Sequence, residues 1–485
     1  MSKKNILAIA LFSMLFWNCT SSTDSNDDSP FPSDEKGSTE GIPSYIKNSS
    51  NTSLDDFFNS LSGENPSIEE LYLNHTFLRF LYLHQNDELD QISSYIGQGA
   101  QYATISSNHP DYPFIDTYYM YATLSDEFTS YFGPYVSEEI LSYITESEEV
   151  VGIGAEVETV GDQICVSTVY WNSPAEKAGL KRGDCITAMS INGSDNLIDV
   201  STEYLFNALI DVASKGTAIT IKYTRDQQEG SLTVVASSFA MPTVILRYKN
   251  SIPVLQIIRF TDTTVVNGGT YEEFMHAMEE IKDAKSMVID LRGNPGGSED
   301  HCVNVASAFV SLGDTMGYAL ASHFDEDLRM GDTQRFDTTY WIATSEGIAK
   351  DKYVVLLADE ESASCAEVMT MILTNLKQYP MVGKTTYGKG IGQYYLSTLV
   401  GLAGITAQQL YDNKNKSYHG YGIAPDINID DEEQALETAV EMAALGTVKR
   451  TAGYGTTPTG NFALAKKAMT PVKRKIPGGF YKILQ

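Results

Sequence analysis

The chain has 485 residues, and this length suggests about three domains. Its 63 acidic and 34 basic residues give a formal net charge of −29. That balance argues against nucleic acid as a partner, because nucleic acids select basic protein surfaces. A hydrophobic content of 42% is ordinary for a globular protein and allows a sizeable core.

The N-terminus has the layout of an export signal. A basic start, MSKKN, precedes the apolar run of residues 6–17, which is shorter than the roughly 20 residues needed to span a bilayer. Cys19 follows, and then a polar, acidic stretch whose composition predicts disorder. We therefore expect a signal peptide over residues 1–18 and a disordered tether over residues 19–50.

This order resembles a bacterial lipoprotein, in which Cys19 would carry the lipid. Trp17 and Asn18 depart from the pattern, because that family usually has small residues there. The resemblance implies an exported protein, lipid-anchored in the periplasm or at the outer membrane or cell surface. Cleavage by an ordinary signal peptidase, without a lipid, is the alternative.

Three regions follow the tether. Residues 51–146 are predicted to be mainly helical, since SIEELYLNHTFLRFLYLH has apolar residues at three- and four-residue spacing. Residues 147–240 change to short β-rich runs broken by Gly, Asn and Asp, with one helix near residues 201–212. Residues 241–445 alternate strands with helices, which predicts an α/β layer with largely parallel strands. Sites in such layers lie where strands end, as DLRGNPGG and ESASCAEV do.

Residues 446–485 form a basic C-terminal tail on an otherwise acidic protein. We expect a solvated appendage, because charged tails are often disordered. Docking of the tail on the protein's own acidic surface or on anionic lipid is the alternative.

Besides Cys19, the cysteines are Cys165, Cys185, Cys302 and Cys365. Four thiols allow three pairings, and the sequence does not choose among them. No cysteine has metal-ligand spacing and the histidines are scattered, so no metal site is predicted.

The stretch EESASCAEVM, residues 360–369, stands between a predicted buried strand and a predicted helix. A corner of small residues exposes a hydroxyl or thiol where the amide N–H groups of a helix start lack partners, as in a nucleophile elbow. Ser is also a common N-cap, so an ordinary capped helix start is the alternative for this stretch alone.

The loop Gly152, Ile153, Gly154 and Ala155 enters a strand, and its successive N–H groups can form a nest for an anion. Together with SPAEKAGLKRGDCITAMSINGS it resembles a PDZ domain. The resemblance implies a groove beside the 201–212 helix, where an extended peptide adds as a strand with its terminal carboxylate in the nest. A β module without a ligand is the alternative.

Further motifs occur in the order found in the carboxyl-terminal processing peptidases, also called tail-specific proteases. They are LSDEFTSYFGP (124–134), DLRGNPGG (290–297), SASCAEV (362–368), VGKTTYGKGIGQ (382–393) and HGYGIAPDI (419–427). The resemblance implies an α/β multidomain fold with an N-terminal helical region, a PDZ-like β module and an α/β peptidase core of the ClpP/crotonase-like type.

The family's residues carry over onto matching positions. The nucleophile is then Ser364 rather than Ser362, the general base is Lys389, and Gln393 supports that lysine. The oxyanion hole would use the amides of Gly297 and Cys365. The chain departs from the family at Cys365, Ala366 and Asn375; the side chain of Cys365 is expected to matter little if only its N–H acts.

The physical reading agrees with these roles. A Ser hydroxyl needs a base, and Lys can serve only when it is neutral and therefore desolvated. Gly388 and Gly390 would let the backbone pack tightly around Lys389, and Gln393 can orient the amine without holding it protonated.

The sequence thus predicts an exported serine endopeptidase that binds protein C-termini in a PDZ domain and cleaves through an acyl-enzyme. Its partners would be proteins or peptides with free C-termini and, through the lipid anchor, a membrane; no cofactor is implied. A catalytically inactive PDZ binding lipoprotein on a peptidase scaffold is the alternative. Acyl-coenzyme A enzymes also have related α/β layers, but the export signal disfavours them.

Overall fold

The structure is a computed structural model that describes residues 43–84, 88–103, 105–194, 196–325 and 327–456. The predicted signal peptide, Cys19, most of the tether and the tail from residue 457 lie outside the described residues. Within the described part of the chain, no helix combines the length and apolarity that crossing a bilayer requires.

The α/β core is built on a six-stranded sheet. Its strand order is β10 (Val244–Lys249), β11 (Ile252–Ile257), β12 (Ser286–Asp290), β15 (Tyr353–Ala358), β16 (Met381–Gly383) and β19 (Ile427–Asn428). The pairs from β11 to β19 are parallel, and only β10 pairs antiparallel to its neighbour. The predicted, largely parallel α/β layer is therefore confirmed.

Helices cover both faces of this sheet. On one face the apolar side chains of alternate strand residues pack with α9 (Gly269–Glu280), α10 (Glu299–Ser307) and α11 (Cys365–Leu376). On the other face they pack with α12 (Glu432–Leu445). Strands buried on both faces read as continuous apolar runs, which explains why YVVLLA was recognisable as a core strand.

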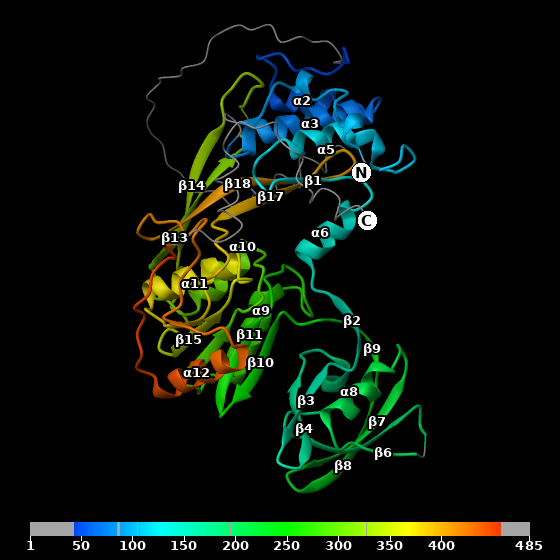
Figure 1. Ribbon diagram of the computed structural model, residues 1–485, viewed down its shortest axis with the longest axis vertical. Coiled ribbons are helices and arrows are strands. Elements are labelled where there is room, and N and C mark those ends of the chain that lie inside the picture. The colour runs from blue at the N-terminus through cyan, green and yellow to red at the C-terminus, as the bar shows by residue number, and fades with distance from the viewer. Residues whose placement is uncertain (1–42, 85–87, 104, 195, 326, 457–485) are drawn as a thin grey trace.

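A second sheet lies above the first (Figure 1). It contains β1 (Ser130–Phe132), β18 (Leu402–Asp412), β13 (Thr315–His323) and β14 (Arg335–Ile342), and β17 (Ile391–Ser397) pairs with β18. Sequence reasoning did not predict this sheet. In β14 the apolar and aromatic residues do not alternate strictly with polar ones, and β1 has only three residues, so neither gives a clear period.

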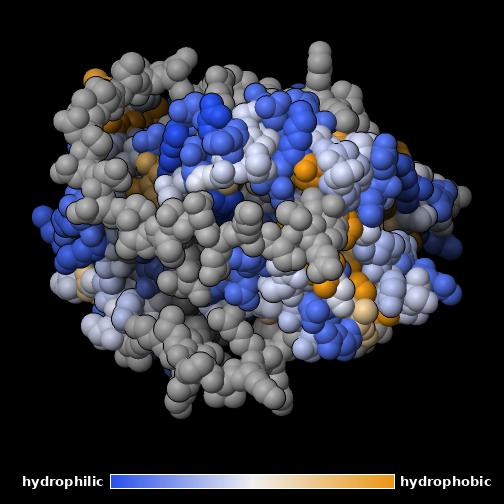
Figure 2. Space-filling view, turned by 90° about the horizontal axis from the view of Figure 1, so that it is seen from above, coloured by the Kyte–Doolittle hydropathy of each residue, from blue (hydrophilic) through white to orange (hydrophobic). Residues whose placement is uncertain are grey.

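The N-terminal helical layer covers this second sheet. It comprises α2 (Leu54–Ser60), α3 (Pro66–Leu81), α5 (Ile115–Ala122) and the short 3-10 helices η1 (Ile92–Ser94), η2 (Gly99–Gln101) and η3 (Tyr112–Phe114). Its buried side chains form one cluster with Leu396, Ala403 and Ile405 of the sheet. Seen from above, the described surface is mainly hydrophilic, with hydrophobic residues in small groups (Figure 2). The apolar sides of these helices therefore face the sheet.

The β-rich region forms a separate module that projects from the core (Figure 1). Its sheet has the order β3 (Ala155–Val160), β4 (Gln163–Val169), β5 (Cys185–Ile191), β7 (Ala218–Arg225) and β8 (Gln228–Val235), with β6 (Ile198–Asp199) beside β5. Two helices complete it, α7 (Pro174–Lys177) and α8 (Glu203–Asp211). The strands β2 (Glu149–Gly152) and β9 (Ser237–Ala240) pair with each other at the entry and exit of the module. The helix α6 (Ser137–Thr145) precedes β2.

The described start of the basic tail is not a solvated appendage. The Arg450 guanidinium pairs with Asp426 at 3.2 Å, and both side chains are only 5% exposed. Tyr454 donates its hydroxyl proton to Asp412 at 2.6 Å. These contacts hold the described residues after α12 against the core, so the expectation of a solvated tail is wrong for them. The alternative, docking on the protein's own acidic groups, applies there.

Candidate active site

The corner after β15 holds its two serines in different ways. The Ser362 side chain is fully buried, and its hydroxyl donates to the Leu291 carbonyl at 2.8 Å. Ser364 is partly exposed and has φ 52° and ψ −117°, a conformation that L residues rarely adopt. An ordinary N-cap has an extended backbone, so this geometry favours a nucleophile elbow over a simple cap.

The glycine loop after β12 touches this corner. A Cβ on Gly296 would lie 2.7 Å from the Ser364 Cβ, and one on Gly297 would lie 1.9 Å from the Phe260 carbonyl oxygen. Both residues have positive φ, 101° and 134°. Only glycine meets both demands, close approach and left-handed backbone.

Two backbone amides remain available at this contact. Among the described residues, the N–H groups of Gly297 and Cys365 donate no hydrogen bond. Cys365 is the first residue of α11, where amides have no intrahelical acceptor. The two donors predicted for an oxyanion hole are therefore unpaired on either side of Ser364.

Glu367 organises the corner from within. Its buried carboxylate accepts hydrogen bonds from the Ser364 N–H at 3.0 Å and from the Lys389 N–H at 2.7 Å. It also accepts from the Gly388 N–H at 2.7 Å and the Thr386 hydroxyl at 2.5 Å. Burial raises the pKa of Glu367 to about 7, and these donors oppose that rise. One side chain thus ties the lysine loop to the serine corner.

The Lys389 amine is largely removed from solvent and lies over an aromatic ring. Its Nζ lies 4.9 Å from the centroid of the Phe128 ring. Burial lowers the pKa of Lys389 to about 8, although the charges of Asp126, Glu367 and Glu127 act in the opposite direction. About a tenth of the amine is therefore neutral at pH 7 and about half at pH 8, which supplies the neutral form that a general base requires.

The glycines flanking Lys389 pack tightly, as predicted. Gly388 has φ 95°, and a Cβ on Gly390 would lie 2.8 Å from the backbone nitrogen of His419. Gln393 lies further along, at the bulged start of β17, where its Nε2 donates to the Thr406 hydroxyl at 3.4 Å. Its recorded hydrogen bond thus goes to Thr406 rather than to the Lys389 amine.

A cavity of about 360 Å³ brings the predicted residues together. Five residues predicted for the site line it: Ser364, Lys389, Gly297, Cys365 and Gln393. Apart from Gln393 of β17, they lie in or directly after the loops that follow β12, β15 and β16, three neighbouring parallel strands. The carboxyl ends of parallel strands meet at one edge of a sheet, which explains the convergence.

Each of the two disulfides joins cysteines of one region, the first in the β-rich module and the second in the α/β core. Cys165 is bonded to Cys185 across the neighbouring strands β4 and β5. Cys302 of α10 is bonded to Cys365, the residue after Ser364. The side chain of Cys365 was expected to matter little. Its disulfide, however, joins α10, which follows the Gly297 loop, to α11, which follows Ser364.

The GIGA loop of the β module is held through its carbonyls, while two of its amides stay unpaired among the described residues. Gly154 has φ 75°, and the carbonyls of Ile153 and Gly154 accept hydrogen bonds from Ala175 and Tyr170. The N–H groups of Ile153 and Gly154 donate to no described residue. β3, which follows the loop, has no strand partner on its outer side in the described sheet, and α8 packs beside it.

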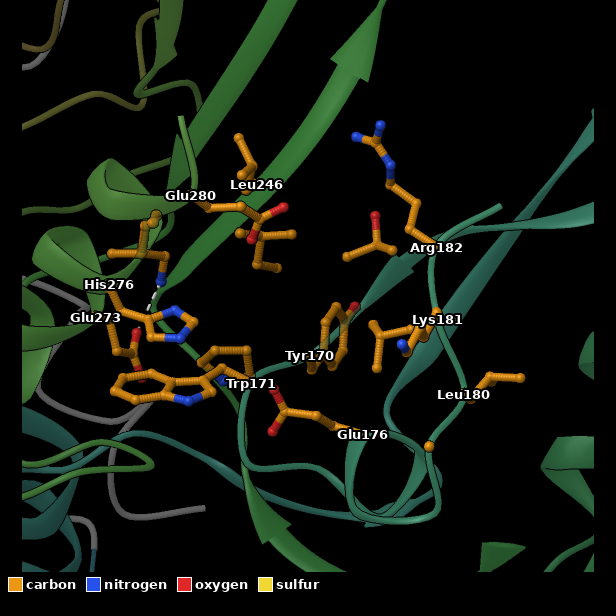
Figure 3. A pocket seen from close by; sticks show the side chains of 17 residues that line it. Tyr170, Trp171, Glu176, Leu180, Lys181, Arg182, Leu246, Glu273, His276 and Glu280 are labelled. Atoms are coloured by element: carbon orange, nitrogen blue, oxygen red, sulfur yellow. Dashed lines mark hydrogen bonds between the residues drawn. The ribbon is translucent and has the colours of Figure 1, made fainter. Parts of the chain in front are cut away.

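The module contacts the core around a second cavity of about 350 Å³. Trp171 of the module stacks on His276 of α9, with ring centroids 4.0 Å apart (Figure 3). The Arg182 guanidinium lies 3.5 Å from the centroid of the Tyr248 ring, and Arg247 pairs with Glu156 at 2.6 Å. These contacts join the β3–α7 side of the module to β10 and α9.

Sequence reasoning missed the roles of two residues. Glu367 stands three residues after Ser364, and this Ser-x-x-Glu spacing is the signature of a capping box. Phe128 lies within the 124–134 motif, but nothing in its sequence context points to a lysine more than 250 residues away. No group of three or more potential metal ligands occurs among the described residues.

Comparison with known proteins agrees with this architecture. The model of peptidase family S41 matches residues 251–429, and the PDZ domain model matches residues 151–235. A "Probable CtpA-like serine protease" of Staphylococcus aureus (strain N315) is 30% identical over 304 residues, which cover 62% of this chain and 57% of that protein. The equally named protein of Staphylococcus haemolyticus (strain JCSC1435) is 30% identical over 316 residues, covering 64% and 58%.

The matched region therefore spans little more than half the length of these relatives. Among solved structures, the photosystem II D1 C-terminal processing protease aligns with 80% of this chain and 98% of its own, at 18% identity and a TM-score of 0.42. The chain thus contains a region that matches the PDZ domain model and a region that matches the peptidase family S41 model, and it is similar to CtpA-like serine proteases.

Proposed function

We propose that the protein is a serine endopeptidase whose nucleophile is Ser364 and whose general base is Lys389. The observation that carries the proposal is the single cavity in which a strained, partly exposed serine and a lysine of lowered pKa lie together. Perturbed titratable groups in a cleft are typical of catalytic sites.

The reaction takes two steps. The neutral Lys389 amine accepts the Ser364 hydroxyl proton while the serine oxygen bonds to the substrate carbonyl carbon. The ammonium then gives that proton to the departing amine as the peptide C–N bond breaks, leaving an acyl-enzyme. Water attacks the ester in the second step, with Lys389 taking its proton and returning it to the serine oxygen.

The unpaired Gly297 and Cys365 amides would stabilise the tetrahedral oxyanion. Loss of one such donor typically costs about 10²–10³ in rate. The glycine loop and the elbow are in van der Waals contact, so these donors are held in place before substrate binds. Preorganised donors of this kind need no rearrangement during the reaction.

We further propose that the PDZ module captures protein C-termini. The outer edge of β3 and the neighbouring α8 fit the addition of an extended peptide, and the free Ile153 and Gly154 amides fit a terminal carboxylate. At the far end of the edge, the Glu203 carboxylate accepts hydrogen bonds from the Thr159 N–H and hydroxyl, at 2.7 and 2.6 Å. A longer peptide strand would have to displace that side chain.

Export and lipid attachment at Cys19 remain part of the proposal. They rest on the order of basic start, apolar run, cysteine and acidic stretch at the N-terminus. If Cys19 carries the anchor, Cys19→Ser should release the protein from the membrane fraction in a cell-fractionation blot. Equal retention of both forms would refute lipid anchoring without affecting the catalytic proposal.

Active-site labelling tests the catalytic proposal. A fluorophosphonate probe should label the purified wild type at Ser364, identified by peptide mass spectrometry, and should not label Ser364→Ala. Ser362→Ala serves as a matched control and should still be labelled if it folds. Absence of labelling in a folded wild type at about pH 9, where Lys389 is mostly neutral, would favour the inactive PDZ binding lipoprotein.

A further inference from the structure

Glu299 is an acidic residue in the catalytic cavity that the proposed mechanism does not use. It is the first residue of α10, directly after the Gly297–Ser298 turn, and it lines the cavity together with Ser364 and Lys389. Its side chain is partly exposed, so it reaches the cavity rather than the core.

The Glu299 carboxylate is held by only one donor. Trp341 of β14 donates its Nε1–H to Oε1 at 2.8 Å. The second oxygen, Oε2, accepts no hydrogen bond from a described residue, and no described cation lies within ion-pair distance of either oxygen. A largely desolvated carboxylate without a counter-ion is costly, and burial accordingly raises the pKa of Glu299 to about 7.

The other charged groups of the cavity lining have partners of their own. Arg259 donates to the Tyr143 carbonyl, and its guanidinium lies 4.3 Å from the Tyr143 ring centroid. Asp262 lies 3.4 Å from the His301 imidazole. The charges that act on Lys389 are those of Asp126, Glu367 and Glu127, so Glu299 does not tune the base.

The same cavity also has apolar residues in its lining. Val368, Tyr395 and Leu410 contribute to its lining. A slot with apolar walls and an acid inside suits a side chain with an aliphatic stem and a cationic end, because Lys and Arg bury their stems and need a partner for the charge. In serine proteases of another fold, an acid in the substrate pocket is a known source of specificity for basic residues.

We propose that Glu299 makes the cavity selective for lysine or arginine at the residue whose carbonyl Ser364 attacks. The inference rests on the proposed peptidase function and adds a substrate class to it. Cleavage should therefore follow basic residues, and peptides with acidic residues at that position should be poor substrates because two carboxylates would share the cavity.

The test uses internally quenched peptides that are identical except at the residue before the scissile bond. Lysine is compared with norleucine, which has a similar aliphatic stem without the charge. For the wild type at about pH 8.5, kcat/KM should be at least about tenfold higher for the lysine peptide, since close charge pairs at interfaces are commonly worth that much. In Glu299→Gln the lysine-to-norleucine ratio should fall to about one.

Asp300→Asn is the matched control. It removes a charge from the same helical turn, but Asp300 is exposed and does not line the cavity, so the ratio should stay at the wild-type value. If Asp262→Asn abolished the preference while Glu299→Gln kept it, the assignment to Glu299 would be overturned.

The wild type alone provides a second measurement should Glu299→Gln fail to fold. Protonation of Lys389 lowers kcat/KM for both peptides by the same factor, so it does not change the lysine-to-norleucine ratio. It should fall as the pH decreases through about 7 and Glu299 gains a proton. The groups that face Glu299 are Asp300, Trp341, Tyr394 and Tyr418, with Arg259, Asp262 and Lys389 elsewhere on the lining.

The two proposals fail in different ways. A wild type that fluorophosphonate does not label refutes the peptidase function, and the specificity proposal falls with it. A wild type that is labelled but cleaves lysine and norleucine peptides equally at about pH 8.5 refutes only the role of Glu299.

Discussion

The serine corner and the GIGA loop both have residues with positive φ and backbone amides that stay unpaired among the described residues, yet they are constrained to different degrees. At the corner, Ser364 itself is strained, and Glu367 binds four donors around it. A disulfide starts at the next residue. The GIGA loop is held by two recorded backbone hydrogen bonds, to the Ile153 and Gly154 carbonyls.

The difference follows from the tasks proposed for the two regions. A transition state is recognised only if its charges meet donors already in place, so the corner needs a rigid frame. A carboxylate captured by a nest needs only unpaired amides on an accessible edge. We therefore expect substitutions at the corner to lower kcat and substitutions at the loop to raise KM.

The largest effect is expected from removal of the base. Lys389→Met keeps the aliphatic stem but leaves Ser364 without a proton acceptor, so kcat/KM should fall by about 10³-fold or more. Steady-state cleavage of a quenched peptide measures this, with Lys384→Met as the matched control, because Lys384 pairs with Glu360 outside the cavity. Equal activity of the wild type and Lys389→Met would show that Lys389 is not the general base.

The second prediction concerns pH. Because the active form of Lys389 is the neutral amine, kcat/KM should rise with pH and reach a plateau above about 8, the lowered pKa. Below that value the rate should fall about tenfold per pH unit. Peptide affinity of the PDZ module should not follow this profile. A rate that is level from about pH 6 to about pH 9 would show that Lys389 does not serve as the base.

The frame around Glu367 should produce an intermediate effect. Thr386→Val removes the buried hydroxyl that donates to Glu367 at 2.5 Å and accepts from the Ile423 N–H at 2.8 Å. We expect kcat to fall by about 10- to 100-fold with little change in KM, because a misplaced base loses orientation rather than binding. Thr385→Val is the control, since its hydroxyl makes no recorded hydrogen bond within the described residues. A change confined to KM would contradict a positioning role.

The disulfides allow a direct comparison of the two regions. Replacing Cys302 and Cys365 by alanine should lower kcat by up to about tenfold, since the helices after the two oxyanion loops lose their covalent link. Replacing Cys165 and Cys185 should lower the thermal stability of the PDZ module but leave kcat for a short peptide unchanged. If both double variants kept the wild-type kcat, the Cys302–Cys365 bond would serve stability alone.

The smallest effect is expected at the GIGA loop. Gly154→Ala places a Cβ 2.3 Å from the Ser173 Cβ at φ 75°, so the nest should distort and KM for a protein substrate should rise by about fivefold. At Gly152 a Cβ meets no atom within 4 Å, and Gly152→Ala serves as the control. An amidated substrate should show the same loss with the wild type. Equal binding of free-acid and amidated peptides would refute carboxylate capture.

Much of the molecule was predictable from local sequence. The α/β core followed from apolar runs alternating with helical periods, and the strand ends located DLRGNPGG and SASCAEV at one edge. The α/β multidomain class with a PDZ module is confirmed by the structure and by the family matches. The structure also gathers Ser364, Lys389, Gln393, Gly297 and Cys365 around one cavity, while their chemical roles stay predictions.

The sequence by itself determined the alternating strands, helices and glycine loops of the α/β core and the β-rich module, because periodicity and turn chemistry act over a few residues. Only the tertiary structure decided which thiols pair, that Phe128 lies over Lys389, and that Glu299 shares a cavity with Ser364. Each of these contacts joins segments well separated along the chain. Their geometry depends on how the two sheets and their helices pack, and local sequence patterns do not predict that packing.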